Sequence, residues 1–184
     1  DAEKDFFASN DLDMSRSHLS RGTGDGKYDR HVRNYAFVKN NFGVYLIWDD
    51  LNYTQASEKA RFTYHTLTTG SKVSGNTVTS PGYEGMSLDA TFLQDENIEP
   101  ELEWQLMGEG YPQRNGQNQF QSISVEHPSN QDFLVVLYPR RNEEASLQME
   151  KLAVENRNAA AYRISKQGSG YFCTLKNSAD SAQS

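Results

Sequence analysis

Along most of the chain, hydrophobic and polar residues alternate with a period of two, which is the spacing of a strand with one buried face. Segment 86–92 is the clearest case, since apolar residues occupy every second position. Segments 44–51 and 133–138 are instead nearly continuous hydrophobic runs, as expected for strands buried on both faces. Further strands are predicted at 32–38, 61–68, 102–107, 122–126, 160–164 and 171–175, with short ones on either side of Gly75-Asn76.

Turn residues separate these segments. Asn40-Asn41 and Gly75-Asn76 each lie between two predicted strands, which indicates two hairpins. Residues 8–31 are polar and rich in Ser and Gly, so we expect a long surface loop there. The one candidate helix is 143–152, and its periodicity is weak. About ten short strands with little helix predict an all-β fold, an antiparallel β-sandwich.

The chain of 184 residues is long enough for one domain with a real core. We predict a polar N-terminal loop region over 1–31 that packs on the domain, a β-sandwich domain over 32–176 and a frayed tail over 177–184. The chain opens at Asp1 without a signal peptide or lipidation motif. This start is typical of a chain that was processed or cut from a longer one.

Charge and composition exclude several classes of function. The net charge is −7, whereas binding DNA or RNA needs a concentrated basic surface, so no nucleic-acid partner is expected. We also expect no membrane association, because no apolar run reaches ~18 residues and the acidic balance disfavours an electrostatic anchor. Cys173 is the single cysteine, which excludes an internal disulfide and a zinc site built from cysteines.

Two consecutive segments carry a resemblance to a known family. They read Arg33-Asn-Tyr-Ala-Phe-Val-Lys39 and Val44-Tyr-Leu-Ile-Trp-Asp-Asp-Leu51, so that a basic residue opens one apolar strand and acidic residues end the next. This arrangement resembles the C-terminal β-sandwich of the heparinase II/III-like polysaccharide lyases. Segments that keep the family's order follow at 62–66, 75–79, 85–93, 122–126 and 132–137, although Gln94 stands where the family has Pro.

The resemblance, which runs from about residue 15 to about residue 140, implies a fold and a substrate class. Lyases of this family act by β-elimination on a uronic acid, with Asn, Tyr and His from an upstream helical toroid and the first sheet after it. This chain lacks that helical part. The resemblance therefore implies a non-catalytic domain, in a periplasmic or secreted bacterial protein, that supports the catalytic domain of its parent chain or contributes binding to an acidic polysaccharide. It places no catalytic residue on this chain, and we expect no cofactor and no metal.

A short basic and aromatic cluster lies at the start of the predicted strand 32–38. It contains the candidate binding residues Tyr28, Arg30, His31 and Arg33. Arginine binds carboxylate or sulfate through two parallel N–H groups, and tyrosine offers a ring with a polar tip. Arg114, in a polar loop rich in amides that suit sugar hydroxyls, is the fifth candidate. The alternative for all five is an ordinary solvated surface.

Other functions stay open on the sequence alone. A free-standing carbohydrate-binding module would need an exposed aromatic platform, which no stripe of the sequence shows. A small β-elimination lyase would need an acid–base pair such as Tyr28 and His31 within this chain. A structural or adhesion domain would bind no glycan at all.

Two acidic segments suggest simpler roles than catalysis or calcium binding. Asp11, Asp13 and Ser15 place oxygen atoms at alternate positions, as calcium loops do, but turn polarity explains them more simply. Asp49 and Asp50 are expected to cap a turn. They cannot face each other across a sugar as glycosidase acids do, because neighbours on a strand point to opposite faces.

Overall fold

The computed structural model describes residues 4–18, 28–39, 42–53, 59–66, 70–93, 101–106, 119–127, 132–154 and 159–176. Within these ranges every regular element is a β-strand, so the predicted all-β class is confirmed. No helix in this part of the chain is long and apolar enough to cross a membrane. The fourteen strands are β1 (Lys4–Ala8), β2 (Leu12–His18), β3 (Tyr28–Val38), β4 (Val44–Tyr53), β5 (Ala60–Thr66), β6 (Lys72–Ser74), β7 (Thr77–Pro81), β8 (Met86–Phe92), β9 (Glu101–Leu106), β10 (Gln119–His127), β11 (Phe133–Arg141), β12 (Gln148–Leu152), β13 (Ala159–Lys166) and β14 (Ser169–Lys176).

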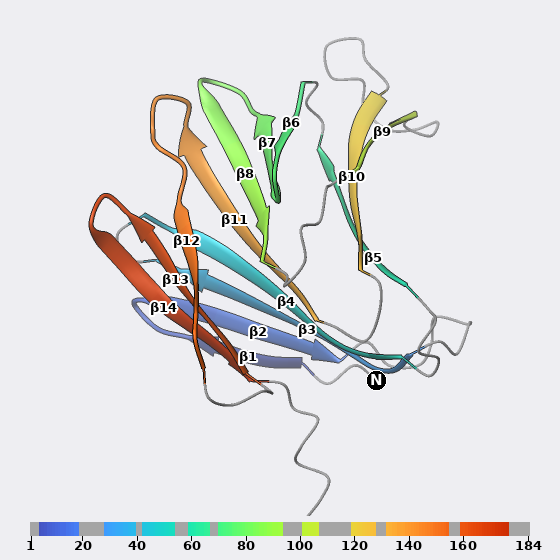
Figure 1. Ribbon diagram of the computed structural model, residues 1–184, viewed down its shortest axis with the longest axis vertical. Coiled ribbons are helices and arrows are strands. Elements are labelled where there is room, and N and C mark those ends of the chain that lie inside the picture. Colours follow the sequence, from blue (N-terminus) through green and yellow to red (C-terminus); the bar gives the residue numbers. More distant parts are fainter. Residues whose placement is uncertain are drawn as a thin grey trace, which may run out of the picture.

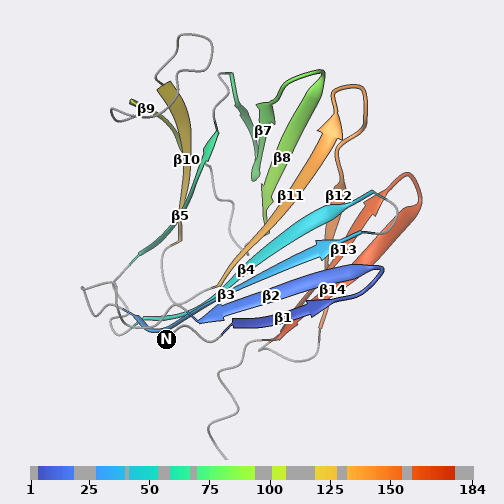
Figure 2. The same cartoon turned by 180° about the vertical axis from the view of Figure 1, so that it is seen from behind.

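The strands form three antiparallel sheets. A central sheet of eight strands has the order β1-β2-β3-β4-β11-β8-β7-β6. Two three-stranded sheets, β5-β10-β9 and β12-β13-β14, lie on opposite sides of it (Figures 1 and 2). The result is a β-sandwich whose central sheet is covered in part on both faces.

Strand β11 shows why the central sheet has two cores. Phe133 and Val135 point toward β5-β10-β9, whereas Leu134 and Val136 point toward β12-β13-β14. All four side chains are buried, which accounts for the continuous hydrophobic run in this segment. The first core adds Ile47, Leu51, Phe62, Val78, Phe92, Ile123 and Val125, and the second adds Val44, Leu93, Tyr162 and Ile164.

The prediction of a loop over residues 8–31 is wrong for the part of this segment that the structure describes. Residues 4–8 and 12–18 form strands that pair with each other, and β2 also pairs with β3 from Leu12 opposite Val38 to His18 opposite Val32. These strands lie at the edge of the sheet, where water reaches the side chains on both faces. Polar residues are therefore tolerated at every position, and the alternation that marks a half-buried strand is missing.

The weak helical candidate at 143–152 is also wrong. Its second half is strand β12, which pairs with β13 from Gln148 opposite Ser165 to Leu152 opposite Ala161. Met149 packs against the second core and its neighbours face water, so this short strand is held by tertiary contacts that its own sequence does not reveal.

Both predicted hairpins are confirmed by strand pairing. Val38 lies opposite Val44 across the first turn, where Asn40 and Asn41 lie outside the described residues. Val73 lies opposite Val78 across the second turn, and Gly75 there has a φ of 56°. This left-handed conformation suits glycine because it has no Cβ.

Candidate functional site

Four of the five candidate binding residues lie on strand β3. The alternation of the strand places His31 and Arg33 on one face, together with Tyr35. A break in the pairing with β4 separates Tyr28 from Arg30. The side chains of Tyr28 and Arg30, and all of Arg114, lie outside the described residues, so their roles in binding stay predictions. The structure thus brings His31 and Arg33 together, and it places both beside a carboxylate.

That carboxylate is Asp49, which lies directly opposite Arg33 on β4. Arg33 Nε donates to Asp49 Oδ1 at 2.6 Å and Nη2 donates to Oδ2 at 2.5 Å. His31 Nε2 lies 3.8 Å from Asp49 Oδ1. The Asp49 side chain is only 3% exposed, so this is a bidentate ion pair at the edge of the core.

The expectation that Asp49 and Asp50 cap a turn is therefore wrong. Both residues lie within strand β4 and both are buried. The two hydrogen bonds from Arg33 replace the water that the carboxylate of Asp49 loses on burial. This explains why a carboxylate can lie buried in the middle of a strand.

The pair stays charged over the ordinary range of pH. Burial alone would raise the pKa of Asp49, but the hydrogen bonds from Arg33, with a smaller effect of His31, lower it overall. The pKa of Arg33 is raised, because its hydrogen bonds to Asp49 outweigh the effect of burial. The nearby side chain of Tyr35 raises the pKa of Arg33 further.

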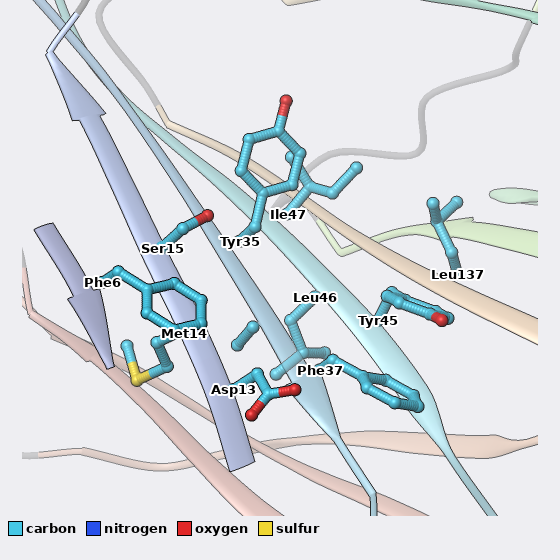
Figure 3. A pocket seen from close by; sticks show the side chains of 11 residues that line it. Phe6, Asp13, Met14, Ser15, Tyr35, Phe37, Tyr45, Leu46, Ile47 and Leu137 are labelled. Carbon is cyan, nitrogen blue, oxygen red and sulfur yellow. The ribbon is translucent and has the colours of Figure 1, made fainter. Parts of the chain in front are cut away.

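Beyond this pair the same face of the central sheet carries a row of rings. The register aligns Phe6, Ser15, Tyr35 and Ile47 across four strands, and it aligns Asp13, Phe37 and Tyr45 in the next row. Together they line a groove of about 390 Å³, which we call the aromatic groove (Figure 3). Its lining residues used below are Phe6, Asp13, Ser15, Tyr35, Phe37, Tyr45 and Leu137.

The rings of the groove are both ordered and accessible. Phe37 and Tyr45 stack with their centroids 4.3 Å apart and their planes 12° apart. Tyr45 is 43% exposed, Tyr35 41% and Phe6 75%. Figure 3 shows Tyr35 beside Ile47, with Phe37 and Tyr45 further along β3 and β4. This set of exposed rings was not predicted from the sequence, although the period-two spacing of Tyr35 and Phe37 and the hairpin register of Tyr45 are signals that indicate it.

A second, polar pocket of about 350 Å³ lies near the end of β11. Arg140 lines it but donates to both carboxylate oxygens of Asp89 and to three backbone carbonyls. Lys166 Nζ lies 2.5 Å from the hydroxyl of Tyr138 and 2.8 Å from Glu144 Oε2. These partners belong to the domain itself, so the cluster ties β11 and β13 together.

Two of the oxygen-bearing side chains in the segment 11–15, Asp13 and Ser15, lie in strand β2. Asp13 forms an ion pair with Lys39 at 2.7 Å, and Ser15 lies on the floor of the aromatic groove. Within the described ranges, no group of three or more His, Cys, Asp or Glu side chains is placed to hold a metal ion.

Comparison with known proteins links the fold to one group of enzymes. No family model matches the chain, and no curated protein matches it by sequence. Among solved structures, it is similar to the heparan sulfate lyase HepC of Pedobacter heparinus, with a TM-score of 0.69 and 15% identity over 95% of this chain. It is also similar to the heparinase III BT4657 gene product, with a TM-score of 0.67 and 12% identity over 95% of this chain.

The match covers only part of each lyase. The chain spans 28% of the HepC chain and 27% of the BT4657 product. At this level of identity the likeness shows a shared fold.

Proposed function

We propose that this chain is a non-catalytic β-sandwich domain of a heparinase II/III-like polysaccharide lyase. On this proposal it supports the catalytic domain of its parent chain and contributes binding to an acidic polysaccharide that contains uronic acid. The observation that carries the proposal is the extent of the structural match, since 95% of this chain superposes on 28% of a heparan sulfate lyase. A domain-sized match of this kind favours one module of a larger enzyme over the whole of it.

The charges on the open face of the central sheet are compatible with an acidic ligand. Asp13, which lines the groove, is paired with Lys39, and Asp49 on the same sheet face is paired with Arg33, so both carboxylates are compensated. Tyr28 and Arg30, on the same strand as Arg33, remain the candidates for direct contact with carboxylate or sulfate groups.

The second candidate function is a free-standing carbohydrate-binding module. The observation that favours it is the aromatic groove, because such a module needs exposed rings and this face provides them. This alternative assumes the same ligand as the main proposal. It differs because the module would act without a catalytic domain in the same parent chain.

Calorimetric titration against a glycan panel tests the proposal. The panel holds alginate, heparan sulfate, chondroitin sulfate, a homopolyuronate and a neutral glucan, and the ultraviolet absorbance of unsaturated uronate is followed in parallel. Binding of the uronates without new absorbance supports a non-catalytic binding domain. Rising absorbance contradicts the non-catalytic part, and Tyr28→Phe with His31→Ala then tests the acid–base pair. Absence of binding contradicts the contribution to substrate binding.

A matched pair of variants locates the charge contacts. Arg30→Ala on β3 is expected to weaken binding of the uronates, whereas Arg163→Ala removes an exposed arginine from β13 in the separate β12-β13-β14 sheet. Equal effects of the two variants would mean that only the total charge of the domain matters.

A further inference from the structure

We propose that the aromatic groove is a sugar-stacking site, in which Tyr45 and Tyr35 hold the pyranose rings of the acidic polysaccharide. This inference rests on the proposed function for the class of ligand. It adds the place where the sugar chain lies and the side chains that hold it.

The groove exists because the second sheet covers only part of this face. Ile47, Phe133 and Val135 lie under β5-β10-β9 and are buried. Tyr45 lies next to this covered area, yet 43% of its surface is exposed, and Phe6 at the sheet edge is 75% exposed. Rings gathered around one hollow on a folded domain mark a binding surface more often than scattered apolar residues do.

Both tyrosines of the groove are accessible to a ligand, and Tyr45 is also packed against a neighbouring ring. The Tyr45 ring stacks on Phe37 at 4.3 Å, while 43% of the surface of Tyr45 stays exposed. Tyr35 follows Arg33 on the same face of β3, and 41% of its surface is exposed. Because the Tyr45 ring is already packed on Phe37, it has less side-chain freedom to lose when a ligand contacts it.

The chemistry of the groove fits a sugar ring. A pyranose has an apolar face of C–H groups and a rim of hydroxyls. The groove offers apolar surface from Phe37, Tyr45 and Leu137, while the hydroxyl of Ser15 and the carboxylate of Asp13 lie along β2. Tyrosine hydroxyls can both donate and accept hydrogen bonds with sugar hydroxyls.

The size and charge of the groove fit a segment of an acidic polysaccharide. A hollow of about 390 Å³ falls in the range of sites for small ring ligands. Since Asp13 is compensated by Lys39, the groove does not repel a chain that carries carboxylates.

Tyrosine substitutions in the intact chain test the proposal. Tyr45→Ala and Tyr35→Ala should each weaken binding of size-fractionated alginate or heparan sulfate oligosaccharides by about tenfold, because each removes one stacked ring. Tyr45→Phe should keep most of the affinity, since it keeps the ring. Tyr83→Ala is the control, because Tyr83 is similarly exposed but lies in the connection between β7 and β8. Thermal unfolding checks that all variants are folded.

Salt dependence gives a second measurement. Stacking on neutral rings should lose little affinity as the salt concentration rises, whereas binding through arginines alone should weaken steeply. The Tyr45→Ala variant should therefore lose affinity by a similar factor at low and at high salt, so that its salt dependence matches that of the unchanged protein.

The possible failures can be told apart. If the protein binds uronates and both tyrosine variants bind equally well, the groove is not the sugar site, while the proposed function stands. If the protein binds no glycan of the panel, both proposals fail. If sedimentation shows that the protein forms a dimer that Tyr35→Ala dissolves, a second copy occupies the groove and the sugar-stacking proposal is overturned.

Discussion

Arg33 joins Asp49 on the neighbouring strand through two hydrogen bonds, while its guanidinium carbon lies 5.2 Å from the centre of the Phe62 ring in the second sheet. One side chain thus links two strands of the central sheet with the layer that covers them. Because the carboxylate of Asp49 is buried, the loss of Arg33 should destabilise the fold more than the loss of one partner in a surface ion pair.

Replacement of Asp49 by Ala is expected to lower the free energy of unfolding by about 3–5 kcal/mol, because Arg33 at the edge of the core would lose the carboxylate that neutralises its charge. Urea unfolding followed by circular dichroism measures this. Glu126→Ala, which breaks an exposed pair with Arg61, is the control and should change little. Equal effects of the two variants would contradict a stabilising role of the buried pair.

The stability of the domain should fall in acid. The pKa values of Asp49 and Asp89 are lowered in the folded protein, since the hydrogen bonds from Arg33 and Arg140 outweigh burial. An unfolded Asp titrates near pH 3.9. The stabilisation is therefore complete above that value and is lost as the pH falls through the lower pKa of the folded state.

Thermal unfolding between about pH 2 and about pH 7 measures this dependence. Asp49→Asn should be less stable near neutral pH. Its unfolding temperature should fall less between neutral and acidic pH, because one titrating carboxylate is gone. If the unfolding temperature of both Asp49→Asn and Asp89→Asn fell in acid as steeply as that of the unchanged protein, other carboxylates would cause the loss of stability.

Ile164→Ala should cost about 2–5 kcal/mol, because the side chain is buried in the second core between β13 and the central sheet. Unfolding followed by circular dichroism and by tryptophan fluorescence should give one coincident transition if β12-β13-β14 is part of the cooperative domain. Val154→Ala, at an exposed position after β12, is the control. A separate early transition would show that this layer unfolds independently.

Gly75→Ala should lower stability by about 1 kcal/mol, because the residue has a φ of 56° in the hairpin between β6 and β7. Gly75→Asn should cost less, since asparagine tolerates the left-handed region better. No atom lies within 4 Å of a Cβ built there, so the cost would come from the backbone alone. Thermal unfolding of the two variants, compared with Ser74→Ala on the adjacent exposed position, measures it.

Local patterns predicted the strands whose burial is one-sided or complete. The continuous hydrophobic runs of β4 and β11 and the alternating pattern of β8 predicted these three strands from the local sequence alone. Strands β1 and β2 were not predicted, because β1 at the sheet edge and β2 beside it are open to water on both faces and carry no such pattern. Strand β12 was not predicted, because Met149 is its one residue that packs against the second core.

The register of the hairpin gives one candidate binding residue a partner that its local sequence does not reveal. The sequence marked Arg33 as a ligand for an external carboxylate, whereas the register of the hairpin gives it an internal one, Asp49. The aromatic groove depends on how far β5-β10-β9 extends over β3 and β4, and that extent is set by packing between distant segments. The local sequence around Tyr35 and Tyr45 is the same whether they are covered or open.

The position of β11 between β4 and β8 determines when the domain can fold. The two halves of the central sheet come from residues before 93, but the strand that joins them begins only at Phe133. A growing chain that has not reached this segment holds two unpaired hydrophobic edges, which are open to wrong pairing and to chaperones. Closure must wait for contacts between distant segments, so we expect slow refolding, and a truncation before residue 133 should yield an aggregating product.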